Sequence, residues 1–65
     1  FAYVGPNATL CGYARVAEGA YVAPNAVVRD RTEMGRFSVL AAGSVAYKSL
    51  PEDSTWIGNP ARRAV

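Results

Sequence analysis

The sequence contains no histidine and a single cysteine, Cys11, among its 65 residues. One thiol cannot build a disulfide framework, and without further cysteines or histidines the chain lacks the ligand cluster of a structural zinc site. We therefore predict no metal site. A lone cysteine weakly favours a reducing compartment, so we expect a cytoplasmic protein.

Charge and long apolar runs are also scarce. Seven basic and five acidic residues leave a net charge of +2, and Arg62 and Arg63 supply much of the excess. This balance does not predict nucleic-acid binding. No apolar run approaches the roughly 20 residues that a membrane-spanning helix needs, so we predict no membrane span.

The length sets a further limit. A chain of 65 residues buries only about 60% of the surface that its unfolded form exposes, and its core is marginal without support. Because disulfides and metals are excluded, support must come from oligomerisation or from a larger parent chain. The chain starts at Phe1, and we expect it to be a piece of a longer protein.

A repeat of eighteen residues is the strongest pattern in the chain. Residues 2–10 read AYVGPNATL and residues 20–28 read AYVAPNAVV. The interval divides by three, because an aliphatic side chain recurs every six residues. The members of this column are Val4, Leu10, Val16, Val22, Val28, Met34 and Leu40.

Small residues form a second column, two positions before each aliphatic residue. Prolines within the repeat exclude an amphipathic helix. Six residues instead allow one very short strand, with its small and aliphatic side chains pointing inward, followed by a turn. The small column comprises Ala2, Ala8, Ala14, Ala20, Ala26, Thr32, Ser38 and Ser44.

Three such strands close a coil of eighteen residues. We therefore predict an all-β protein, a parallel β-helix of about three coils, in which each coil buries the next. In this arrangement the corner residues Pro6 and Asn7 stack on Pro24 and Asn25.

The residue between the two inward positions of each strand points outward, which predicts three external columns. Exposed apolar stripes usually mark an interface, whereas the alternative is that good strand formers occupy half-exposed sites. We predict subunit contacts on the two apolar columns. The columns are Tyr3, Tyr21 and Val39; Thr9, Val27 and Val45; and the polar set Arg15, Glu33 and Pro51.

The repeat fails after Val45, because Ala46 is a weak core residue and Glu52 stands at the next aliphatic position. We predict that the chain leaves the prism over residues 47–51, and we divide it into β-helix coils over residues 1–46 and a C-terminal segment over residues 47–65. In that segment, Trp56 is expected to cap the last coil before a turn at residues 58–60.

The six-residue pattern resembles the hexapeptide repeat of the left-handed parallel β-helix acyltransferases over residues 2–45. The left hand is implied by the resemblance and runs against the usual crossover preference. The runs AAGSVAYK at residues 41–48 and GNPAR at residues 58–62 resemble the C-terminal signature of coenzyme-A-dependent enzymes of this family. Within the family, the runs resemble those of the galactoside, maltose and sialic-acid O-acetyltransferases, and the resemblance implies a homotrimer.

The resemblance also implies which residues contact acetyl coenzyme A. Ala42 matches a position whose backbone amide faces the pantetheine arm, and the small residues around Gly43 leave room for that arm. Lys48 and Arg62 match basic residues near the phosphates, where a point charge and a planar fork suit phosphate oxygens. Val65 replaces a further arginine of some relatives, and the alternative for the two cations is that they are ordinary solvated charges.

Acyl transfer to a hydroxyl or amine needs a base, usually a histidine. The resembling enzymes use one and this chain has none, so we predict no catalytic residue here. The main hypothesis is a C-terminal fragment of an acetyl-CoA-dependent sugar O- or N-acetyltransferase, whose acceptor is a sugar or nucleotide sugar. The alternatives are a non-catalytic β-helical trimerisation module, or an excised or designed solenoid, and coenzyme A binding separates the first hypothesis from both.

Overall fold

The computed structural model describes residues 1–64, and these residues contain ten strands and no helix. Eight strands of two residues each are followed by two longer ones. They are β1 (Tyr3–Val4), β2 (Thr9–Leu10), β3 (Arg15–Val16), β4 (Tyr21–Val22), β5 (Val27–Val28), β6 (Glu33–Met34), β7 (Val39–Leu40), β8 (Val45–Ala46), β9 (Thr55–Gly58) and β10 (Ala61–Arg63).

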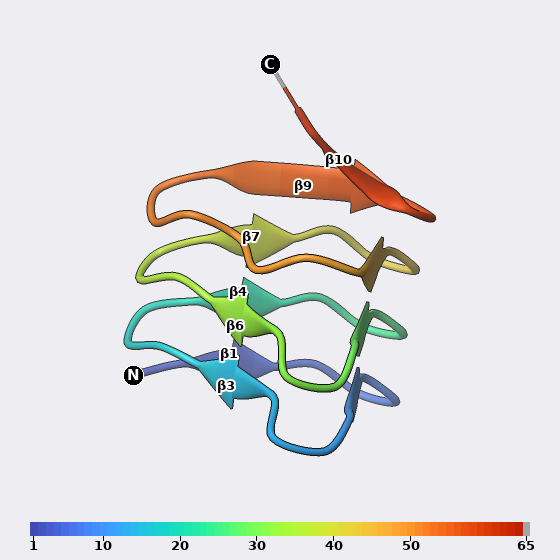
Figure 1. Ribbon diagram of the computed structural model, residues 1–65, viewed down its shortest axis with the longest axis horizontal. Coiled ribbons are helices and arrows are strands. Elements are labelled where there is room, and N and C mark those ends of the chain that lie inside the picture. Colours follow the sequence, from blue (N-terminus) through green and yellow to red (C-terminus); the bar gives the residue numbers. More distant parts are fainter. Residues whose placement is uncertain (65) are drawn as a thin grey trace.

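The strands stack in parallel, one coil above the next (Figure 1). Sheet order is β1-β4-β7-β9-β10 on the first face, β2-β5-β8 on the second and β3-β6 on the third. The register places Tyr3 opposite Tyr21 and Leu10 opposite Val28, which are offsets of eighteen residues. The predicted parallel β-helix of about three coils is therefore confirmed.

Three corners join the faces in each coil. The first corner comprises residues 5–8, 23–26 and 41–44, the second comprises residues 11–14, 29–32 and 47–48, and the third comprises residues 17–20, 35–38 and 51–54. In most of them the third residue has positive φ, and its amide can then donate to the coil below. The Asn25 amide donates to the Pro6 carbonyl and the Gly43 amide to the Pro24 carbonyl, at 3.0 and 3.1 Å. The predicted stacking of Pro6–Asn7 on Pro24–Asn25 is confirmed.

The core consists of the two inward columns. Val22, Val28, Met34 and Leu40 are fully buried, whereas Val4 in the first coil is 44% exposed. Small residues fit beside them because three strands converge on a narrow axis. The buried hydroxyls keep partners; that of Ser38, for example, donates to the Gly35 carbonyl at 2.7 Å.

The chain does not leave the prism over residues 47–51, so that prediction is wrong. Leu50 forms a parallel bridge with Met34, and Trp56 lies opposite Leu40. Both offsets are sixteen residues, so the third coil is two residues shorter than the others. Leu50 is 3% exposed and takes the inward place that the six-residue count assigned to Glu52.

The shortening also changes the third external column. Because Leu50 lies opposite Met34, Ser49 rather than Pro51 takes the place above Glu33 in this column. The Ser49 hydroxyl accepts a hydrogen bond from the Glu33 amide at 3.0 Å. The predicted Pro51 position is therefore wrong. We propose that the boundary at residues 46 and 47 separates a regular from a shortened part of one solenoid.

Gly35 accommodates the shortened coil. A Cβ atom on Gly35 would lie 2.6 Å from the Glu52 nitrogen and 2.7 Å from the Leu50 carbonyl oxygen. These are backbone atoms, which cannot rotate out of the way. Residues 50–52 therefore require a residue without a side chain directly beneath them, as Pro24 does above Gly5 in a coil of regular length.

Strands β9 and β10 close the C-terminal end, where β10 returns antiparallel to β9 (Figure 1). Trp56 is half-buried and packs against the core cluster, and its indole nitrogen donates to the Ser54 hydroxyl at 2.9 Å. Trp56 therefore caps the last coil as predicted. Within residues 1–64, no helix is long and apolar enough to cross a membrane.

The external columns follow the prediction on the first two faces. Tyr3 and Tyr21 remain 47% and 41% exposed, and their rings stack with centroids 4.7 Å apart. Val39 and Thr55 extend the same column toward the C-terminal end. The fold thus presents a continuous stripe of strand residues with aromatic and aliphatic side chains at its surface.

Candidate functional site

The strands and the short corner bring Lys48 and Arg62, fourteen residues apart in sequence, to one pocket. Its volume is about 360 Å³. Lys48 comes from the shortened second corner and Arg62 from β10, which lies next to β9 because the two strands pair. The pocket is lined by Lys48, Trp56, Pro60, Ala61, Arg62 and Arg63.

The lining gives this pocket a positive charge. Lys48, Arg62 and Arg63 bring three cations, and no acidic residue lines it. All three side chains are exposed, so a ligand can reach them without displacing the core. A lysine ammonium and two guanidinium forks match the oxygens of phosphate groups.

Four lining residues were not among the predicted site residues, namely Trp56, Pro60, Ala61 and Arg63. Trp56 packs against the core cluster and also forms part of the pocket wall. A sequence signal existed for Arg63, because it forms a basic pair with Arg62. Trp56 was predicted only to cap the last coil, and a capping role does not by itself indicate a binding site.

Ala42 and Gly43 do not line this pocket; they lie at the first corner of the third coil. Gly43 adopts φ of 70° and its amide donates to the Pro24 carbonyl at 3.1 Å, whereas the Ala42 amide donates to no described backbone carbonyl. Of the two amides, that of Ala42 is therefore the one available to a ligand.

The first corner of the third coil connects to the pocket through Ser44. The Ser44 hydroxyl accepts a hydrogen bond from the Gly58 amide at 2.9 Å, and Gly58 begins the turn that leads to Pro60 and Ala61 in the pocket wall. Ala42 and the cationic pocket are thus held at the same end of the solenoid.

A second groove of about 360 Å³ lies along the third face and shares no lining residue with the first pocket. It runs beside the second corner, where Arg31 and Thr32 lie one coil above Tyr13 and Ala14. Its wall combines aromatic, cationic, acidic and hydroxyl side chains. They belong to Tyr13, Ala14, Arg15, Arg31, Thr32, Glu33 and Ser49.

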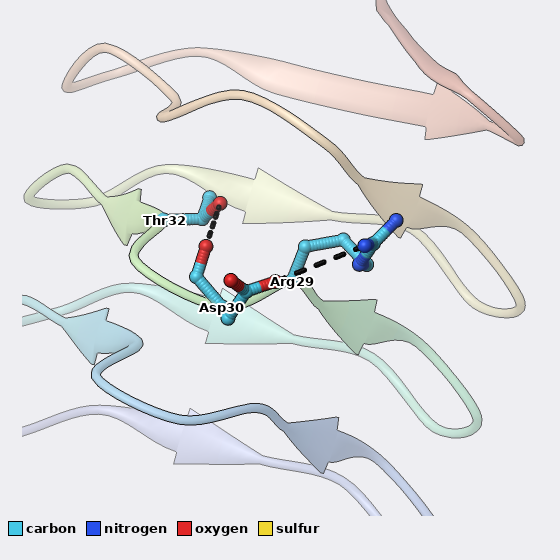
Figure 2. A network of polar contacts seen from close by, with 3 residues as sticks. All are labelled: Arg29, Asp30 and Thr32. Carbon is cyan, nitrogen blue, oxygen red and sulfur yellow. Dashed lines mark hydrogen bonds and ion pairs between the residues drawn. The ribbon is translucent and has the colours of Figure 1, made fainter.

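Polar contacts fix the corner beside this groove (Figure 2). The Thr32 hydroxyl donates to the Asp30 carbonyl at 3.3 Å, and the Arg29 guanidinium lies 3.7 Å from the Asp30 carboxylate. Arg29 also stacks over the ring of Tyr47, 5.0 Å from its centroid. Asp30 is thus paired with Arg29 and lies outside the lining of the groove.

Residues 1–64 contain no cluster of three or more metal-ligating side chains. Val65, which stands where some relatives have an arginine, lies outside the described residues. The predicted site residues therefore divide into two groups, Lys48 with Arg62 in one pocket and Ala42 with Gly43 at the adjoining corner.

Comparison with known proteins identifies the architecture. No protein-family model and no curated protein matches the sequence. Among solved structures, a hexapeptide-repeat-containing acetyltransferase from Vibrio cholerae, complexed with acetyl coenzyme A, aligns with a TM-score of 0.93 at 22% identity over 98% of this chain and 45% of that one.

Two further structures have higher identity. PerB from Caulobacter crescentus, in complex with coenzyme A and GDP-perosamine, aligns with a TM-score of 0.93 at 31% identity over 95% of this chain and 30% of that one. A serine acetyltransferase in complex with coenzyme A has a TM-score of 0.91 at 29% identity, over 97% and 28% of the two chains.

These neighbours confirm the resemblance to the hexapeptide-repeat acyltransferases and the left-handed parallel β-helix that it implied. The chain spans less than half the length of each of the three proteins. The likeness to galactoside, maltose and sialic-acid O-acetyltransferases stays a prediction.

Proposed function

We propose that this chain, which has the left-handed parallel β-helix of the hexapeptide-repeat acetyltransferases, forms the C-terminal coils of an acetyl-CoA-dependent acetyltransferase acting on a sugar or nucleotide sugar. The cationic pocket formed by Lys48, Arg62 and Arg63 carries the proposal. Neighbours crystallised with coenzyme A or acetyl coenzyme A, one of them with a sugar nucleotide, support it.

In this proposal, Lys48, Arg62 and Arg63 hold the phosphates of coenzyme A, which supplies an acetyl thioester when bound. Guanidinium groups bind phosphate oxygens through two parallel hydrogen bonds, and the ammonium adds a mobile point charge. The Ala42 amide has no described backbone acceptor, and in this proposal it donates to a carbonyl of the pantetheine arm.

The acceptor's proton must go to a base, and the chain contains no histidine. The residues described contribute cofactor binding and subunit contacts, and the base lies outside these residues. We expect the isolated chain to bind coenzyme A without transferring an acetyl group.

The test is a calorimetric titration of the chain with coenzyme A and, in parallel, with dephospho-coenzyme A, which lacks the 3′-phosphate. Lys48→Ala and Arg62→Ala should each weaken coenzyme A binding by roughly three- to tenfold, because these exposed cations each supply one charge-assisted contact. Arg36→Ala, an exposed cation on the third corner, is the matched control and should bind as the unmodified chain does.

A smaller effect of Lys48→Ala or Arg62→Ala on dephospho-coenzyme A would assign that residue to the 3′-phosphate. No saturable binding by a folded chain would instead favour the second candidate, a non-catalytic trimerisation module. The stacked Tyr3 and Tyr21 on an exposed face favour that candidate as a function in its own right.

A further inference from the structure

The groove on the third face has features that the proposed function does not use. It is lined by Tyr13, Arg15, Arg31, Glu33 and Ser49 above a floor of Ala14 and Thr32. We propose that it binds a second ligand, a phosphorylated sugar, whose phosphate is held by the two arginines.

Tyr13 is the first observation that points to a ligand. It has φ of 62°, a conformation that large side chains rarely adopt, and its side chain is 84% exposed. At the equivalent corner positions, Asn7 and Gly43 are residue types that tolerate this conformation. Phe37 shares the conformation but its ring packs over Gly19, whereas Tyr13 and Arg31, which both line the groove, adopt it with exposed side chains.

The charges in the groove are the second observation. Arg15 and Glu33 are direct neighbours on adjacent strands, the arrangement in which opposite charges usually pair. Among the described residues, however, the one ion pair joins Arg29 to Asp30. Both arginines of the groove are therefore available to an external anion.

Arg31 lines the groove, and its neighbour Asp30 is paired with Arg29. Its backbone is held by a hydrogen bond from its amide to the Gly12 carbonyl at 3.0 Å, and it stands one coil above Tyr13. The backbone that carries the guanidinium is thus held in place, and the guanidinium has no carboxylate partner among the described residues. Two guanidiniums against one carboxylate leave the groove with a charge of about +1, which suits a single phosphate.

The remaining groups suit the body of a sugar. A phenol ring offers a flat apolar face with a polar tip, while the Glu33 carboxylate and the Ser49 hydroxyl can hydrogen-bond sugar hydroxyls. A bare phosphate would contact only the arginines and would leave Tyr13, Glu33 and Ser49 without a ligand partner. The combination therefore favours a sugar phosphate over an inorganic anion.

The experiment is an NMR titration of the full chain with α-D-glucose 1-phosphate as the probe, with glucose and inorganic phosphate as separate arms and no coenzyme A present. We expect saturable shifts at the amides of Tyr13, Arg31 and Ser49, with a dissociation constant of about a millimolar because the groove is shallow. Glucose or phosphate alone should bind at least fivefold more weakly.

Two variants keep the fold intact while altering the site. Tyr13→Asn removes the ring with a residue that tolerates positive φ, and Arg31→Gln removes the charge; each should weaken binding at least fivefold. Arg36→Gln, outside the groove, should leave it unchanged. Absence of saturable binding, equal binding of phosphate alone, or unaltered affinity in both variants would overturn the proposal. Tyr13→Asn should bind coenzyme A as the unmodified chain does, because the two sites share no lining residue. Coenzyme A binding by this variant, measured separately, therefore tests the cationic pocket independently of the groove.

Discussion

The substitution Gly35→Ala tests the shortened third coil, the feature that places Leu50 in the core and Lys48 beside Arg62. The added Cβ would lie 2.6 to 2.8 Å from backbone atoms of Leu50, Pro51 and Glu52, so the corner above must move. Overpacking of this kind costs about 1–3 kcal/mol.

The backbone effect of the substitution has the opposite sign. Alanine restricts the unfolded chain and stabilises the folded state by about 0.4–1 kcal/mol where its conformation is allowed. The net expectation is a loss of about 1–2 kcal/mol, which lowers the melting temperature by about 4–16 °C in a domain of this size.

Gly12→Ala is the matched control. Gly12 lies at a corner of the first coil, where an added Cβ would meet no atom within 4 Å. This variant should melt at the temperature of the unmodified chain or a few degrees above it, since only the unfolded-state effect remains.

The assay is thermal unfolding followed by circular dichroism, with all chains at the same concentration because association shifts the midpoint. Gly35→Ala should also bind coenzyme A more weakly, because Lys48 lies two residues before Leu50, in the coil that is displaced. If Gly35→Ala melted no lower than Gly12→Ala, the shortened coil would be wrong as described.

Three other predictions concern the core, the interface and the pocket. Val22→Asp places a charge without a partner at a fully buried position and should abolish the cooperative melt, at a cost of several kcal/mol; an unchanged melt would contradict the inward column. The exposed Tyr3–Tyr21 stripe predicts a trimer in analytical ultracentrifugation at tens of micromolar, and Tyr21→Glu should give a monomer with unaltered circular dichroism; a monomeric unmodified chain would contradict this. Coenzyme A affinity should fall about tenfold between 50 and 500 mM NaCl as the exposed cations are screened; a salt-independent affinity would exclude Lys48 and Arg62 as phosphate ligands.

The regular part of the fold could be predicted from the sequence because equivalent coils repeat along a single axis and each coil contacts only its neighbours. An aliphatic residue every six positions leaves a single way to bury Val22, Val28 and Met34 together. The stacking of Asn7 and Asn25 follows from the same count, since each coil rests on an equivalent coil.

The sequence count failed where the period changes. Leu50 replaces Glu52 at the inward position because burial of an aliphatic side chain outweighs strict spacing, and two residues are removed from the coil to achieve it. No local signal indicates that omission, because Gly35 lies under a close backbone approach just as Gly5 does beneath a coil of regular length.

The candidate sites divide in the same way. Lys48 and Arg62 could be predicted as phosphate ligands from the sequence, by resemblance. Their convergence with Trp56 and Arg63 in one pocket required the pairing of β9 with β10. The groove at Tyr13 and Arg31 was not predicted at all. Residues eighteen positions apart in the sequence become neighbours only when the coils stack. Whether opposite charges at such positions form an ion pair depends on the directions of their side chains, which the spacing in the sequence does not determine.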